Sequence, residues 1–217
     1  NLYLFNGWKN NWTGIMIYVV GMGPGHIDFV SPEAIKIIQA VESVIAFGRI
    51  SKTAEQLRED VSVAKTVAEI ESHIADNHQK NIAILASGDP CFFGIAKYLK
   101  HKNIQIDRII PGISSFQYMA SKLAIEWQEA AFFTCHGRQM DLLPVMQKKL
   151  SILLTDKKTP PDKISQWLHN EGAEGKIWVG SDLSYPNESI VERNIGEPLN
   201  IHSDLNVIFI QIETITL

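Results

Sequence analysis

The residues of this chain best suited to chemistry on a small molecule form a glycine-rich turn. The apolar segment 16–20 runs into Gly21-Met22-Gly23-Pro24-Gly25, and a helix with Ser31 as N-cap and Pro32 as its first residue follows. This order predicts a ligand site at the carboxyl edge of a parallel sheet. A dinucleotide site would need glycine in place of His26, and a triphosphate-binding loop would need Gly-Lys-Ser/Thr, so the sequence has neither pattern.

Two more turns repeat this design after later apolar segments. Ser87-Gly88-Asp89-Pro90 follows segment 82–86, and Pro111-Gly112-Ile113-Ser114-Ser115 follows segment 104–110. Asp89 and the two serines could simply cap helices, because their side chains accept backbone N–H groups well. For Asp89 we favour a ligand contact, since it lies where α/β sheets bind ligands. Three such turns together predict one shared pocket.

Two polar motifs lie further along the chain. Cys135-His136-Gly137-Arg138 follows the apolar segment 131–134. A lone histidine is more often structural than catalytic, but a guanidinium beside it suits the binding of a carboxylate. The second motif, Ser184-Tyr185-Pro186-Asn187-Glu188, has the composition of a turn.

Strands and helices alternate in the elements that must position these residues. Strands are expected at 16–20, 44–47, 82–86 and 104–110, with helices at 32–43, 66–79, 92–100 and after 115. This alternation predicts a parallel sheet covered on both faces, with the fully apolar strand 82–86 at its centre.

The second half has a different pattern. Short apolar strands are expected at 131–134, 151–154, 177–179, 189–193 and 207–213, with helices at 140–149 and 161–170. We therefore predict an α/β protein of two α/β domains, residues 16–124 with a mainly parallel sheet and residues 125–217 with a mixed sheet. Residues 1–15 are interpreted as a leader or an extension added upstream.

Composition excludes several classes of function. The 217 residues include 20 Lys and Arg against 24 Asp and Glu, a net charge of −4, which disfavours a nucleic-acid-binding protein. The two cysteines lie far apart, and no Cys/His spacing indicates a metal site, so a reducing cytoplasm is expected and no metal. No apolar run has the length needed to span a membrane.

Taken together, the motifs resemble those of a known family. Gly-Met-Gly-Pro-Gly, Ser-Gly-Asp-Pro-Cys-Phe-Phe-Gly and Pro-Gly-Ile-Ser-Ser, in this order and spacing, are similar to the turns of the tetrapyrrole (corrin/porphyrin) methylases, which use S-adenosyl-L-methionine. Cys-His-Gly-Arg and Asp-Leu-Ser-Tyr-Pro-Asn-Glu resemble the subgroup that methylates C5 of a precorrin or cobalt-precorrin in cobalamin biosynthesis. One departure is Ser87, where many relatives have glycine.

The resemblance implies two α/β domains, a cofactor in the cleft between them, and a homodimer. Residue by residue it assigns the cofactor site to Pro24, Ser87, Gly88, Asp89, Phe92, Ser114, Ser115, Leu154 and Gly180. Arg49, Arg138 and Tyr185 are the candidates for binding the substrate and its carboxylates. His136 is the candidate base for the proton that C5 must lose after methylation.

Alternatives remain open at this point. The same fold could methylate another position of the ring, make diphthine, or modify ribosomal RNA, although the acidic balance of charge disfavours RNA. A non-enzymatic binding protein with a decayed methylase fold is the alternative from another class. A separate C15-methylating decarboxylase (CbiT-like) is an expected partner.

Overall fold

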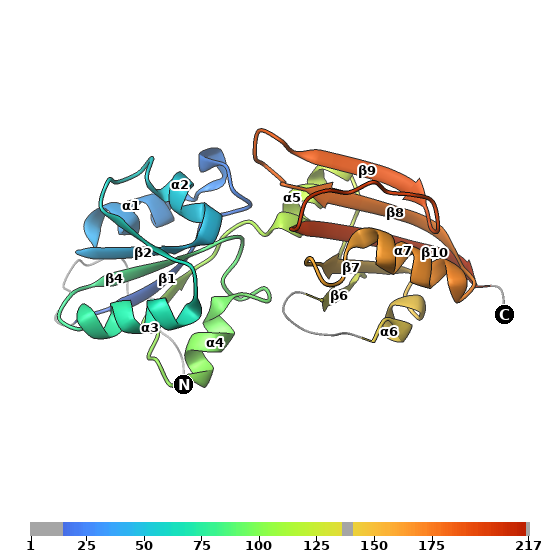
Figure 1. Ribbon diagram of the computed structural model, residues 1–217. Coiled ribbons are helices and arrows are strands. Elements are labelled where there is room, and N and C mark those ends of the chain that lie inside the picture. Colours follow the sequence, from blue (N-terminus) through green and yellow to red (C-terminus); the bar gives the residue numbers. More distant parts are fainter. Residues whose placement is uncertain (1–14, 136–140, 216–217) are drawn as a thin grey trace.

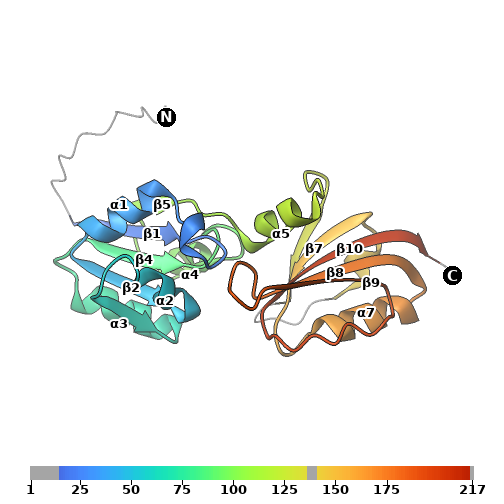
Figure 2. The same ribbon diagram turned by 90° about the horizontal axis from the view of Figure 1, so that it is seen from above.

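The computed structural model describes residues 15–135 and 141–215, which form two five-stranded sheets side by side (Figure 1). The leader predicted at 1–15 therefore lies almost entirely outside the described residues. A second view, turned by 90°, shows helix α5 where the two halves meet (Figure 2).

The first sheet is entirely parallel, with strand order β3-β2-β4-β1-β5. Its strands are β1 (Ile17–Gly21), β2 (Ser43–Phe47), β3 (Val61–Ala64), β4 (Ile82–Ala86) and β5 (Arg108–Ile110). The helices of this half are α1 (Pro32–Ala40), α2 (Ser51–Ala54), α3 (Val67–Asp76) and α4 (Ile95–His101), with short 3-10 helices at Ile27–Phe29 and Gly48–Ile50.

Strand β4 lies at the centre of this sheet and is buried on both faces. Ala83 and Leu85 pack in one cluster with residues of α1 and α2, while Ile82 and Ile84 pack in another with residues of α3 and α4. Successive strand side chains point to opposite faces, so only a strand that is apolar at every position can be covered by helices on both sides.

The second sheet is mixed, with strand order β6-β7-β10-β8-β9. Strands β6 (Ala131–Thr134) and β7 (Leu150–Leu154) are parallel, whereas β8 (Ala173–Ser181), β9 (Ser189–Asn194) and β10 (Asn206–Ile215) form the antiparallel pairs. Helices α6 (Leu143–Met146) and α7 (Pro161–Asn170) supply residues to the core on one face, and α5 (Ser115–Leu123) supplies residues to the core on the other.

The predicted fold class is confirmed: one sheet is parallel, the other is mixed, and the apolar strand is central. The sequence did not indicate β3 or α2. β3 is a short edge strand in which Ser62 and Val63 are exposed, so it lacks the apolar signal of a buried strand.

Several predicted elements are shorter in the structure. The strand expected at 104–110 pairs only over Arg108–Ile110. The helix expected at 92–100 begins at Ile95, because Phe93 has a φ of +50° and Gly94 is the N-cap. The helix expected at 140–149 is described only as Leu143–Met146.

Helix α5 packs on the second sheet although it follows the last strand of the first. Phe116, Met119 and Ala120 lie in one cluster with Trp178 and Phe209. The division of the chain after residue 124 stays a prediction. Over the part of the chain that is described, no helix has the length and apolar character needed to cross a bilayer.

Candidate functional site

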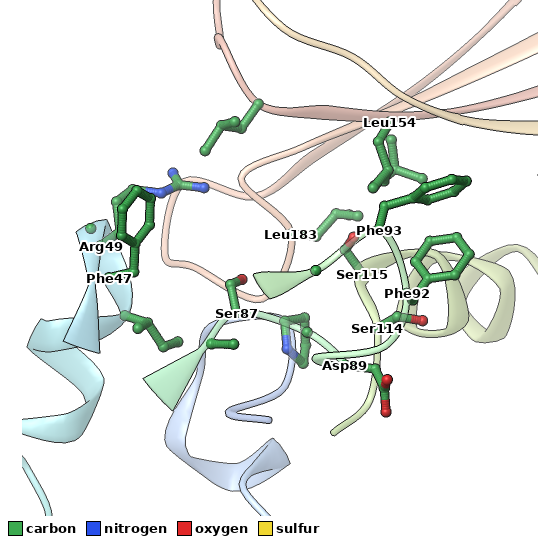
Figure 3. A pocket seen from close by; sticks show the side chains of 18 of the residues that line it. Phe47, Arg49, Ser87, Asp89, Phe92, Phe93, Ser114, Ser115, Leu154 and Leu183 are labelled. Carbon is green, nitrogen blue, oxygen red and sulfur yellow. The ribbon is translucent and has the colours of Figure 1, made fainter. Parts of the chain in front are cut away.

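A cavity of about 570 Å³ lies between the two sheets and is lined by residues of both halves (Figure 3). Its volume is within the range of about 300–1,000 Å³ that small-molecule sites occupy. Two of the three substrate candidates, Arg49 and Tyr185, lie in its wall. All nine residues assigned to a cofactor site by the sequence also line it, namely Pro24, Ser87, Gly88, Asp89, Phe92, Ser114, Ser115, Leu154 and Gly180.

The three glycine turns meet backbone to backbone at the edge of the first sheet. The N–H of Gly88 donates to the carbonyl of Gly23 at 2.7 Å. A Cβ added to Gly112 would lie 2.2 Å from the carbonyl oxygen of Gly88, and one added to Gly21 would lie 2.5 Å from the nitrogen of Gly112. Glycine is needed here because no side chain fits between the turns, and their packing fixes the floor of the cavity.

Asp89 uses both carboxylate oxygens on the backbone of these turns. Oδ1 accepts the N–H of Cys91 at 2.8 Å, and Oδ2 accepts the N–H of Gly112 at 3.2 Å. In Figure 3 the carboxylate points away from Leu154 and Phe93. Asp89 therefore ties the second turn to the third, and its contact with a ligand stays a prediction.

Three serines in these turns differ in what their hydroxyl groups contact. Ser114 is the buried N-cap of α5, and both its N–H and its hydroxyl donate to Oε1 of Gln117, at 2.9 and 2.8 Å. Within the described part of the chain, the hydroxyls of Ser87 and Ser115 have no hydrogen-bond partner. These two hydroxyls, at the cavity wall, are available to a polar ligand.

Two neighbouring phenylalanines on the cavity wall have different surroundings. Phe92 contacts Phe116 and Phe132 at ring-centroid distances of 4.5 and 5.3 Å, so it anchors the second turn in the core of the other half. Phe93 is 45% exposed and holds a positive φ, a conformation that costs a bulky residue free energy. Such strain is common at ligand-binding positions.

The second sheet supplies a wall that the sequence predicted only in part. Leu154 and Gly180 were expected, but Thr155, Leu183, Asn206 and Val207 were not. Asn206 accepts the hydroxyl of Ser181 at 2.6 Å through its side chain, while its backbone carbonyl accepts the N–H of Thr155 at 3.1 Å. The usable signal was position, since Thr155 directly follows the predicted strand that ends at Leu154.

Arg49 is already paired with a residue of the other half. Its guanidinium donates to Oδ1 of Asp182 and lies 4.6 Å from the centre of the Tyr185 ring. Burial raises the pKa of the Tyr185 phenol, and the neighbouring Arg49 opposes that shift. The sequence predicted Arg49 and Tyr185 as substrate contacts and gave no sign of this pairing.

Acid–base groups are scarce on the cavity wall. Among the described residues that line it there is no histidine, cysteine or lysine, and Arg49 and Asp89 are the charged members. The search of residues 15–135 and 141–215 also found no cluster of His, Cys, Asp and Glu that could hold a metal ion. His136 and Arg138 lie outside the described residues. The described wall is thus suited to orient ligands and exclude water.

Comparisons with known proteins agree with this architecture. The family model for Tetrapyrrole (Corrin/Porphyrin) Methylases matches residues 16–199. The chain is 34% identical over 200 residues to the probable cobalt-precorrin-7 C(5)-methyltransferase of Methanocaldococcus jannaschii, covering 85% of this chain and 92% of that one.

Two solved structures share the fold. One is the cobalamin biosynthesis precorrin-6Y methylase (cbiE) of Archaeoglobus fulgidus, with a TM-score of 0.73 and 22% identity over 92% of this chain and 99% of that one. The other is the uroporphyrin-III C-methyl transferase of Thermus thermophilus complexed with S-adenyl homocysteine, with a TM-score of 0.70 and 18% identity over 89% and 96%.

Proposed function

We propose that this chain, which belongs to the tetrapyrrole (corrin/porphyrin) methylases, transfers a methyl group from S-adenosylmethionine to C5 of a precorrin or cobalt-precorrin in cobalamin biosynthesis. The observation that carries the proposal is that one cavity is lined by all nine residues that the family resemblance assigns to the cofactor. The choice of C5 rests on the relative that is 34% identical over 85% of this chain.

The cavity wall fits S-adenosylmethionine, which supplies an electrophilic methyl group on a sulfonium when bound. Ser87 and Ser115 offer hydroxyls without partners among the described residues, and Leu154 and Val207 offer apolar surface. The thioether left after transfer is neutral, so no acid is needed to protonate it. The residues of the wall would act by orienting the reactants and excluding water, which alone lower the barrier substantially.

The rim of the cavity supports a large conjugated acceptor. Phe47, Phe93 and Leu205 line the cavity and are 40%, 45% and 42% exposed, so they present apolar surface to a flat ring. Figure 3 shows Phe47 and Phe93 on opposite sides of the cavity. Arg49 supplies positive charge for acceptor carboxylates only if it exchanges Asp182 for them.

The remaining parts of the proposal concern the base, the second carboxylate ligand, the assembly, the location and the partner. His136 as the base and Arg138 as a carboxylate ligand stay predictions. A homodimer stays a prediction. A cytoplasmic location is supported by the free thiols of Cys91 and Cys135. A C15-methylating decarboxylase of the CbiT type stays a predicted partner.

Incubation with S-adenosylmethionine carrying a ¹³C-labelled methyl group tests the proposed function. The chain is mixed with a panel of precorrins and cobalt-precorrins, and the products are analysed by NMR. We expect one new ¹³C methyl signal coupled to C5. A labelled methyl group on another ring carbon would favour a methylase that acts at a different position of the ring. Binding of S-adenosylhomocysteine without transfer to any acceptor would favour a non-enzymatic protein.

A further inference from the structure

The loop 182–188, between β8 and β9, reaches from the second half of the molecule to the first. Asp182 and Ser184 hold φ values of +47° and +67°, which non-glycine residues adopt only when their surroundings stabilise them. Ser184 is buried and its N–H donates to Oε2 of Glu188 at 2.6 Å. The conformation of the loop therefore depends on the contacts that it makes.

The first attachment of the loop is to the first glycine turn and to His26, which directly follows it. The N–H of His26 donates to Oγ of Ser184 at 2.9 Å. The ring of Tyr185 lies on Gly25, where an added Cβ would come within 2.3 Å of it. Thr53 fixes the same turn by donating its hydroxyl to the carbonyl of Gly25 at 2.6 Å.

A second attachment joins the loop to Arg49, in the short 3-10 helix that follows β2. Arg49 donates to Oδ1 of Asp182, and Asn187 donates to Oδ2 of the same carboxylate at 2.8 Å. The side chain of Asp182 is 14% exposed and that of Arg49 is 47% exposed. An ion pair with one exposed partner is weakened by salt, so added salt should loosen this attachment.

Both attachments lie at the cavity, because Pro24, Arg49 and Tyr185 line it. We propose that Arg49, Asp182 and Tyr185 form a latch that joins the two halves across one side of the cavity and slows the departure of a bound ligand. Asp182 is a positioning residue in this scheme, since it acts through Arg49. The latch rests on the proposed function only in the choice of ligand.

The substitution Asp182→Asn tests the latch with S-adenosylhomocysteine as the probe. It removes the charge and keeps the shape of the side chain. We expect dissociation in stopped-flow experiments to be about two- to five-fold faster, the range that an exposed ion pair supports. Dissociation from the wild-type chain should also accelerate with added salt, and this salt dependence should be smaller in the variant.

Glu33→Gln is the matched control. Glu33 pairs with Arg108 inside the first half, the two side chains are 33% and 41% exposed, and neither is among the residues that line the cavity. S-adenosylhomocysteine should dissociate from this variant at the wild-type rate and with the wild-type salt dependence. An equal acceleration in both variants would show a general effect of lost charge and would overturn the latch.

Hydrogen exchange of the His26 amide tests whether the latch exists when no ligand is bound. We expect faster exchange at His26 in Asp182→Asn and unchanged exchange in Glu33→Gln, because His26 bonds to the loop. Unchanged exchange in Asp182→Asn would refute the latch. Faster exchange with unchanged dissociation would refute its role in holding a ligand. A wild-type chain that does not bind S-adenosylhomocysteine would contradict the proposed function, and the exchange data would still decide whether the latch exists.

Discussion

At the residue scale, Asp89 and Ser87 differ in what their side chains hold. Asp89 accepts two backbone N–H groups, whereas the Ser87 hydroxyl has no partner among the described residues. We expect Asp89→Ala to lower the free energy of unfolding by about 1–3 kcal/mol, because two donors lose their acceptor. Ser87→Ala should leave stability within about 0.5 kcal/mol and weaken S-adenosylhomocysteine binding by about 0.5–1.5 kcal/mol. Urea unfolding and calorimetric titration measure the two effects. An Asp89→Ala chain of unchanged stability would argue against the structural role of the carboxylate.

At the element scale, the three turns form one unit because their glycines leave no space between them. A Cβ on Gly112 would meet only backbone atoms, of Gly88 and Gly21, at 2.2–2.9 Å. Gly112→Ala should therefore destabilise the protein by about 1–3 kcal/mol and weaken S-adenosylhomocysteine binding, since backbone cannot rotate away as a side chain would. Gly48→Ala is the control for stability alone, because Gly48 itself lines the cavity: its Cβ would meet nothing within 4 Å, so only the cost of its φ of +61° applies, about 1–2 kcal/mol. Thermal unfolding compares the stability of the two variants, and titration measures binding by the Gly112→Ala chain. If Gly112→Ala were no worse than Gly48→Ala, the close packing of the turns would not matter.

At the scale of the whole molecule, Glu188 helps to hold in place the loop 182–188, which joins the two halves, because it accepts the N–H of Ser184 and pairs with Lys122 of α5. Burial raises the pKa of the Glu188 carboxyl. Hydrogen bonds from Tyr118, the N–H of Ser184 and Lys122 lower it by more than burial raises it, so the net pKa is below the ordinary 4.5. A carboxyl with a depressed pKa stabilises the fold fully above pH 4.5, and this contribution disappears as the pH falls through the lowered value. The wild-type chain should thus exceed Glu188→Gln in stability at pH 7, and the difference should shrink below pH 4.5.

Urea unfolding of both chains between pH 7 and pH 3 measures this difference. Glu192→Gln provides the comparison, because Glu192 bonds to Lys176 and Trp178 inside the second half and its side chain is 50% exposed against 21% for Glu188. A smaller effect is expected there, since solvent screens exposed charges. A stability difference for Glu188→Gln that stays constant down to pH 3 would contradict the assignment.

The sequence by itself determined the fold class and which turns line the cavity. Apolar residues at every position of 82–86 require cover on both faces, which only a central strand receives. The turns after β1, β4 and β5 follow parallel strands, and parallel strands end at the same edge of a sheet, so the three turns had to meet. Short exposed β3 was missed because an edge strand needs few apolar residues.

Only the tertiary structure decided which partner each polar group takes. Asp89 binds the backbone 23 residues away, and Arg49 binds Asp182 across 133 residues. Local spacing places such groups at the edge of a sheet, but a hydrogen bond requires donor and acceptor within about 3 Å. That distance depends on how the turns pack on one another for Asp89, and on how the two halves pack for Arg49. The packing of the two halves brings Leu183 and Asn206 to the cavity, since nothing in their own segments distinguishes a wall residue from an ordinary core residue.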